Sequence, residues 1–256
     1  GKKSHNIIVK SINALESMTH RGAIGADGKT GDGCGILVDL DKEFFVKALW
    51  NEKKIKIINE FAIGQIFTNE KIEKDLSSIN KILNSENLVL TAVRKVPINK
   101  KILGEIALNC LPNIYQLYIQ STDKIFYEEK FETNLYQARK LIEEIYLDDE
   151  KFYFCSLSSK TIVYKGLMLP DAIHKFYLDL KSPRFKSSVC VFHQRFSTNT
   201  QPRWHLAQPF RLLAHNGEIN AIRGNRNWVK ARSSKFKSPR LPKIQKFKQL
   251  VNETGS

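Results

Sequence analysis

Two short apolar runs, each followed by polar residues, constrain this chain more than any other feature. The run Val189–Phe192 leads into Arg195 and Thr198. The run Leu212–Ala214 leads directly into the pair Asn216-Gly217 after one histidine. Short apolar runs of this kind are typical of buried strands. We therefore expect two strands of one sheet that deliver their polar residues to the same rim.

The residue types at this rim indicate a particular chemistry. An arginine beside a hydroxyl side chain can hold a carboxylate through parallel charge-assisted hydrogen bonds. An asparagine amide beside a glycine N–H can donate two hydrogen bonds to a developing oxyanion. The pattern predicts a pocket for an amino acid whose side-chain carbonyl is attacked. Two alternatives stay open: Arg195 binding loop carbonyls, and Asn216-Gly217 forming a simple hairpin turn.

Composition places the chain among ordinary globular proteins. Its 256 residues, 42% of them hydrophobic, suit one large domain or two small ones. No apolar run approaches the ~20 residues of a membrane span. The cysteines are scattered, without the spacing of metal ligands or a disulfide framework, so we expect reduced thiols, a reducing compartment and no metal site. Their positions are Cys34, Cys110, Cys155 and Cys190.

Hydrophobic periodicity predicts helices interspersed with short strands, which is typical of an α+β fold. The expected helices are Ser4–Met18 with Ser4 as N-cap, Phe44–Trp50, Ile72–Leu83, Glu128–Tyr146, Pro170–Tyr177 and one from Asn225. The first of these should end near Gly22 in a left-handed cap. Further strands are expected over Ile36–Leu40, Ile63–Phe67, Leu88–Arg94 and Ile114–Ile119, with a hairpin formed by Tyr153–Leu157 and Thr161–Tyr164.

Three motifs, in order, carry a family resemblance. They are MTHRGAIGADGKTGDGCGIL at Met18–Leu37, SLSSKTIVYKGLM at Ser156–Met168, and HQRFSTNT with AHNGEIN and RGNRNW within His193–Trp228. Together they resemble the glutaminase domain of glutamate synthases, within the class II glutamine amidotransferases. The resemblance covers most of the chain and is weakest between about residues 51 and 151. It implies a four-layer αββα sandwich of the N-terminal-nucleophile hydrolase type over residues 1–256.

The resemblance also implies roles for residues of the site. Arg195 binds the α-carboxylate of glutamine with help from Thr198, and Asn216 and Gly217 form the oxyanion hole. Arg21 and Ser159 support the site. A helix C-cap explains Arg21 equally well, and a plain polar turn is the slightly weaker alternative for Ser159. Cys34 is the one cysteine to consider as a rival nucleophile, and a buried, inert thiol is the better interpretation.

The family's nucleophile is an N-terminal cysteine whose own amine acts as base, and a later aspartate binds the substrate amine. Neither is present, so we expect a chain truncated at both ends that releases no ammonia from glutamine by itself. No cofactor is expected in it. The intact enzyme would carry FMN and an iron–sulfur cluster in a downstream synthase domain, with ferredoxin or a nicotinamide-oxidising subunit as electron source. Lys-, Ile- and Asn-rich segments hint at an AT-rich genome, which favours a plastid stroma over a bacterial cytoplasm.

The charge distribution leaves a second class of function open. The net charge is +15, and no acidic residue lies between Ile219 and Asn252. Such a basic tract can bind nucleic acid or an acidic partner. It lacks a recognisable binding module or an aromatic ladder, so a solvated surface is the preferred interpretation, with neither nucleic acid nor membrane as partner. Another class II amidotransferase, phosphoribosyl or asparagine-forming, is the alternative within enzymes.

Overall fold

In the computed structural model, described residues are 1–146, 151–195, 201–211, 221–242, 244–247 and 250–251. Their helices are α1 His5–Ser17, α2 Lys42–Lys53, α3 Leu76–Ser85, α4 Glu105–Asn109, α5 Glu128–Ile145, α6 Ile173–Phe176 and α7 Ile222–Arg232. Their strands are β1 Cys34–Asp39, β2 Phe61–Thr68, β3 Leu88–Lys95, β4 Asn113–Ser121, β5 Phe152–Ser158, β6 Thr161–Gly166 and β7 Cys190–Gln194.

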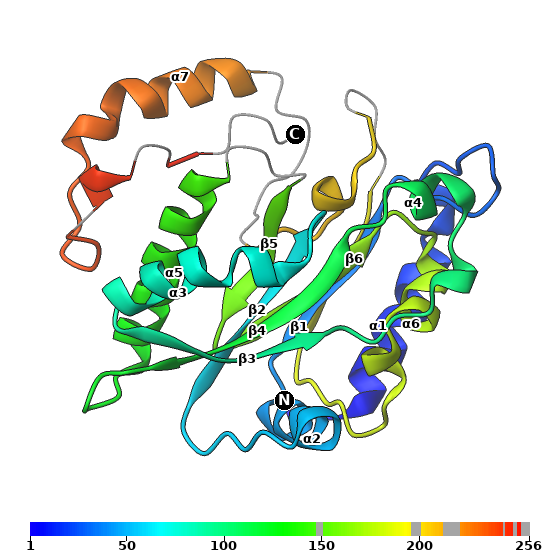
Figure 1. Cartoon of the computed structure of the whole chain (residues 1–256). Coiled ribbons are helices and arrows are strands. Elements are labelled where there is room, and N and C mark those ends of the chain that lie inside the picture. Colours follow the sequence, from blue (N-terminus) through cyan, green and yellow to red (C-terminus); the bar gives the residue numbers. More distant parts are fainter. Residues whose placement is uncertain (147–150, 196–200, 212–220, 243, 248–249, 252–256) are drawn as a thin grey trace.

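The strands form two antiparallel sheets that lie in successive layers (Figure 1). One sheet has the order β3-β4-β2-β5, and the other has the order β6-β1-β7. Helices α3 and α5 cover the outer face of the first sheet, and α1 and α6 cover the outer face of the second. The expected αββα sandwich is therefore confirmed. Among the helices described, none has the length and apolar character needed to cross a bilayer.

The apolar side chains of the described core form two clusters. Leu135, Ala138 and Ile142 of α5 are fully buried against the first sheet, as their helical spacing predicts. Ile145 follows the same helical spacing but is 51% exposed, in the last turn of α5. The second sheet packs on α1 through Ile8, Ile12 and Leu15. The strands sit between covered faces, and most therefore show runs of buried residues.

The expected hairpin between residues 153 and 164 is wrong. Strand β5 pairs with β2, whereas β6 pairs with β1, so the turn at Ser158–Lys160 carries the chain from one sheet to the other. Both strands are buried along most of their length. Strands covered on both faces lack the alternation that would identify a pairing partner, and a short turn suits either connection.

Three expectations about helices are also corrected. Helix α1 begins after Ser4 as expected, but the Ser4 side chain makes no capping hydrogen bond. Gly22 is extended, with φ −125° and ψ 159°, because the chain continues from α1 through a 3₁₀ turn at Thr19–Arg21. The helix expected over residues 72–83 is split into a 3₁₀ turn, Ile72–Lys74, and α3.

Candidate active site

The three sequence motifs meet at one end of the second sheet. Cys34 of β1 pairs with Gly166 of β6 on one side and with Gln194 of β7 on the other. The backbone N–H of Arg195 then donates to the carbonyl of Gly33 over 2.8 Å. This end of the sheet therefore brings together residues from all three motifs.

Arg195 lies at the centre of this meeting point, immediately after β7. Its side chain is only 4% exposed, and its guanidinium donates to the carbonyl of Asp32 over 3.4 Å. Burial lowers the pKa of Arg195, and the neighbouring Asp32 opposes that shift. A guanidinium held at a strand end and removed from most solvent suits a carboxylate ligand, because Arg can donate two parallel hydrogen bonds. Carboxylate binding by Arg195 stays a prediction.

Gln194 is a site residue that the sequence did not single out. It is 5% exposed, and its side-chain amide makes no hydrogen bond within the part of the chain that the structure describes. The amide lies against Gly22, where any larger side chain would collide with it. A buried amide without partners calls for a physical explanation such as a ligand or a water. A polar residue at the end of an apolar strand, directly before Arg195, is the signal that could have revealed it.

Arg21 and Ser159 lie in different parts of the structure. Arg21 is exposed in the 3₁₀ turn beside Gly22, so its backbone lies close to Gln194. Ser159 donates from its N–H and its hydroxyl to Glu132 of α5, over 2.6 and 2.7 Å. It lies beyond the Thr161 end of β6, whereas Arg195 lies near the Gly166 end. The structure thus does not bring Ser159 to Arg195, because about six residues of strand, roughly 20 Å, separate them.

Thr198, Asn216 and Gly217 lie outside the described residues. The described residues nearest to them in the sequence are Arg195 and Gln201 for Thr198, and Arg211 and Ala221 for the other two. Asn216 follows Arg211 by five residues, so the two Cα atoms are at most about 18 Å apart. The roles expected for these three residues stay predictions.

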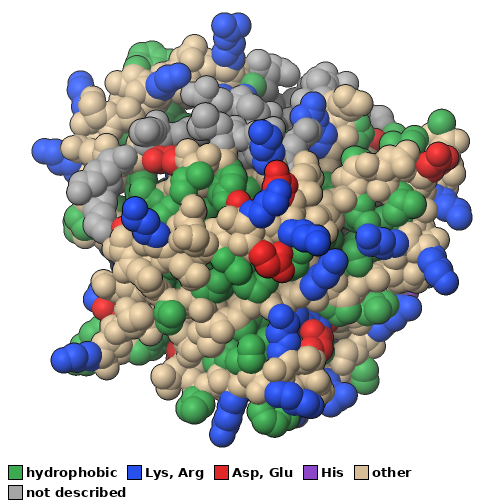
Figure 2. Space-filling model, in the orientation of Figure 1, with side chains coloured by type: hydrophobic (Ala, Val, Ile, Leu, Met, Phe, Trp, Pro, Cys, Tyr) green, Lys and Arg blue, Asp and Glu red, His purple; other side chains and the backbone are tan. Residues whose placement is uncertain are grey.

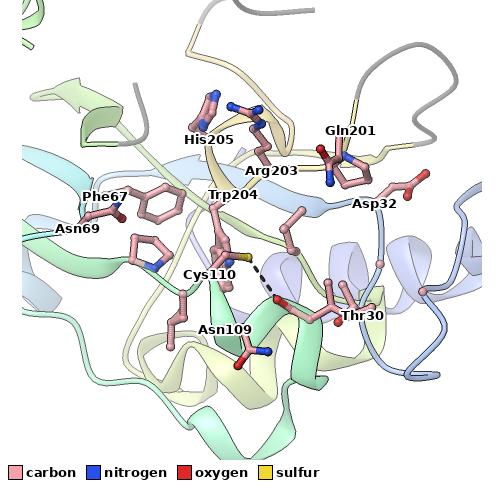
Figure 3. Close-up of a pocket in the computed structure, with 17 residues that line it drawn as sticks. Thr30, Asp32, Phe67, Asn69, Asn109, Cys110, Gln201, Arg203, Trp204 and His205 are labelled. Atoms are coloured by element: carbon pink, nitrogen blue, oxygen red, sulfur yellow. Dashed lines mark hydrogen bonds between the residues drawn. The ribbon is translucent and has the colours of Figure 1, made fainter. Parts of the chain in front are cut away.

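A cavity of about 730 Å³ opens beside this end of the sheet. Its volume is in the range of small-molecule sites. Figure 3 shows Arg203 and His205 at its upper rim and Asn109 and Cys110 at its lower rim, with Trp204 between them. The thiol of Cys110 donates to the carbonyl of Ile106 over 3.3 Å (dashed in Figure 3). Arg195 is not among the lining residues, and the cavity and Arg195 meet at Asp32.

The buried cysteines are poor nucleophiles. Cys34 is fully buried, and burial, reinforced by the charge of Asp171, raises the pKa of its thiol. Burial also raises the pKa of Cys155 to about 12. Cys190 and His193 lie three residues apart on β7 and therefore point to opposite faces of the strand. Across the described ranges, no group of three or more His, Cys, Asp or Glu could hold a metal ion.

Comparison with known proteins gives the same assignment as the motifs. The family model described as "Glutamine amidotransferases class-II" matches residues 1–256. The chain is 39% identical to a ferredoxin-dependent glutamate synthase of Cyanidium caldarium, over 100% of this chain and 17% of the relative. It is 41% identical to the NADPH glutamate synthase large chain of Azospirillum brasilense, over 93% and 16% respectively.

It is also 39% identical to "Ferredoxin-dependent glutamate synthase 1, chloroplastic/mitochondrial" of Arabidopsis thaliana, over 92% of this chain and 15% of the relative. The chain thus spans only about one sixth of the length of these relatives. The family match over every residue and the meeting of its motifs at Arg195 establish that the chain belongs to the class II glutamine amidotransferases.

Proposed function

We propose that this chain is the glutamine-hydrolysing domain of a glutamate synthase, with residues 1–256 as one domain. The observation that carries the proposal is the buried guanidinium of Arg195, held where the three motifs meet. Arg195 would bind the α-carboxylate of glutamine, and Thr198 would add a hydroxyl or backbone contact. The glutamine side chain would then extend toward Asn216 and Gly217.

The proposed reaction is hydrolysis through a covalent intermediate. In the family, an N-terminal cysteine thiolate attacks the side-chain amide carbon of glutamine, forming a C–S bond. The carbonyl oxygen takes the negative charge, which the Asn216 amide and the Gly217 N–H would stabilise. The C–N bond then breaks, and the nitrogen leaves as ammonia with a proton from the cysteine's amine. Water hydrolyses the thioester and releases glutamate.

The fully buried cysteines do not fit an iron–sulfur cluster, because cysteine thiolates hold such clusters. Cys34 and Cys155 are fully buried with raised thiol pKa values, and the parts of the chain described hold no metal-binding cluster. We therefore propose the iron–sulfur cluster for the remainder of such an enzyme, and FMN with it because the family resemblance implies both. No step in glutamine hydrolysis is routed through them.

For the whole protein we propose the transfer of ammonia to 2-oxoglutarate, which is then reduced to glutamate. Two of the relatives compared above are named ferredoxin-dependent and one NADPH-dependent, so ferredoxin is the electron donor we favour. A plastid is the location we favour, with a bacterial cytoplasm as the alternative. On the face in Figure 2, Lys and Arg are scattered over many elements, a distribution typical of a solvated surface.

The proposal is tested on the full-length protein that includes this chain. Arg195→Gln should raise the KM for glutamine, because a charge-assisted carboxylate contact is lost, and lower kcat/KM about 10- to 100-fold. Asn216→Ala should lower kcat about 10²- to 10³-fold with little change in KM, because its amide acts mainly on the oxyanion. Both effects are measured as ammonia release from glutamine.

Arg184→Gln is the matched control, because Arg184 is an exposed arginine away from this end of the sheet. It should leave both constants unchanged. An unchanged KM in Arg195→Gln would remove the carboxylate-binding role. Absence of glutamine-dependent ammonia release in the unmodified full-length protein would refute the proposed function itself.

A further inference from the structure

Residues Gln201–Arg211, here called the strap, cross the ends of β1 and β6. In the sequence, Thr198 precedes the strap and Asn216 follows it. Trp204 anchors the strap through a hydrogen bond and a ring contact. The Trp204 indole N–H donates to the carbonyl of Ala107 over 3.2 Å, and the ring packs edge-on against Phe67 at 5.9 Å.

The floor beneath the strap has no room for larger side chains. A Cβ atom at Gly35 would lie 2.5 Å from the carbonyl oxygen of Gln208. Gly33 has φ +123°, a conformation that favours glycine, and a Cβ there would lie 2.8 Å from the Ala207 side chain. The strap backbone therefore rests directly on the backbone of β1 and the loop before it.

Lys165 of β6 lies beneath the strap and contacts it at two positions. Its side chain is fully buried, and Nζ donates to the carbonyl of His205 over 2.7 Å. The same ammonium lies 4.9 Å from the centre of the Phe210 ring. It also lies 4.6 Å from the centre of the Tyr153 ring, and it donates to the Tyr153 hydroxyl over 3.3 Å. One cation thus joins the strap to both sheets.

A second cation fixes the end of the strap. The Arg211 guanidinium donates to the carbonyl of Phe154 in β5 and pairs with Glu143 of α5 at 3.5 Å. It also lies 5.4 Å from the centre of the Tyr153 ring. The Tyr153 ring therefore contacts the cations of both Lys165 and Arg211, which hold the strap at residues 205, 210 and 211.

We propose that Lys165 is a positioning residue for glutamine hydrolysis, an inference that rests on the proposed function. By holding His205 and Phe210, it fixes the position of the strap, which lies between Arg195 and Asn216 in the sequence. Burying a cation is unfavourable compared with an apolar side chain of similar volume, so its presence here suits a role in fixing geometry. A displacement of about 1 Å in a catalytic arrangement can cost about 10²-fold in rate.

The test uses Lys165→Met in the full-length protein, because methionine keeps much of the volume and removes the cation. We expect kcat for glutamine to fall about 10- to 100-fold, with a smaller change in KM. Glutamate formation from 2-oxoglutarate with free ammonia in place of glutamine should keep its rate, because ammonia bypasses this site. Phe210→Leu, which keeps the lysine and removes one ring contact, should lower kcat about threefold to tenfold.

Gln65→Met is the matched control. Gln65 is also fully buried, and its amide donates to the carbonyl of Val163, two residues before Lys165 on β6, over 2.7 Å. This variant should lower the melting temperature at least as much as Lys165→Met while leaving kcat for glutamine within about twofold.

Three results would overturn the inference. They are an unchanged kcat in Lys165→Met, equal losses of kcat in Lys165→Met and Gln65→Met, and a parallel loss of the ammonia-supported rate. If Lys165→Met does not fold, an unchanged kcat in Phe210→Leu overturns it instead. None of these refutes the proposed function, which fails separately if the unmodified protein releases no ammonia from glutamine.

Discussion

At the residue scale, two buried cations reach the same end of one sheet. Arg195 is 4% exposed and Lys165 is fully buried. Each donates to a main-chain carbonyl, Arg195 to Asp32 and Lys165 to His205. Buried cations with such partners hold loops in defined positions, because moving either loop would leave a charged donor unsatisfied. The loop before β1 and the strap are therefore the segments whose positions matter most for the proposed chemistry.

Cys34→Ala should leave glutamine turnover by the full-length protein within about twofold of normal. Burial raises the pKa of the Cys34 thiol, so it stays protonated at neutral pH, and a protonated thiol is a weak nucleophile. Ammonia release from glutamine is the measurement. Loss of turnover in Cys34→Ala or Cys34→Ser would make Cys34 the nucleophile and contradict the proposed mechanism. Alkylation of the native protein offers a control, since Cys110 is exposed and should react before Cys34.

At the element scale, the loop between α1 and β1 is tied to α4 through one carboxylate. Asp27 accepts hydrogen bonds from the hydroxyl of Thr30 over 2.6 Å and from the N–H of Ile106 over 2.9 Å. Thr30 in turn accepts from the N–H of Ala107 over 3.1 Å. A carboxylate at a helix N-terminus is favourable because the N–H groups there are otherwise unpaired. This contact fixes the wall of the cavity that Thr30 and Ile106 share.

The Asp27 contact should make stability depend on pH in the acid range. Hydrogen bonds from Thr30, first its hydroxyl and then its N–H, hold the pKa of Asp27 well below its ordinary value and outweigh desolvation. Its stabilisation is therefore fully present above the unfolded pKa of about 3.9 and is lost as the pH falls toward the folded value. Melting temperatures of the unmodified chain and Asp27→Asn, compared across pH, check this. The difference should shrink below about pH 4, and a difference that grows there would contradict it.

The sequence predicted helices and strands well where the apolar periodicity is local. It predicted strand pairing and side-chain burial poorly, because these depend on residues elsewhere in the chain. Helices α1 and α5 follow from their apolar stripes, and β1 to β4 from short apolar runs. The pairing of β5 with β2 could not be predicted, because buried strands carry no alternation to identify a partner. The burial of Lys165 could not be predicted either, because it depends on Tyr153 in the other sheet and on the strap.

At the scale of the whole molecule, the stacked sheets explain why distant motifs form one site. Strand β1 lies between β6 and β7, so residues near positions 34, 166 and 194 become neighbours although they are far apart in the sequence. Motif order and the family resemblance predicted the four-layer sandwich, and the carboxylate-binding role that the resemblance implies for Arg195 stays a prediction. They did not predict the cavity beside Asp32 or the contacts that Lys165 and Arg211 make around the strap, because side chains from several layers form both.

A structure of the full-length protein with glutamate bound would show whether Arg195 and Asn216 face the same ligand. We expect the ligand's α-carboxylate about 3 Å from the Arg195 guanidinium, with its side-chain carboxyl group beside Asn216 and Gly217. Glutamate bound only in the cavity of Trp204 and Asn109, with the Arg195 and Asn216 side chains directed to separate regions, would contradict it.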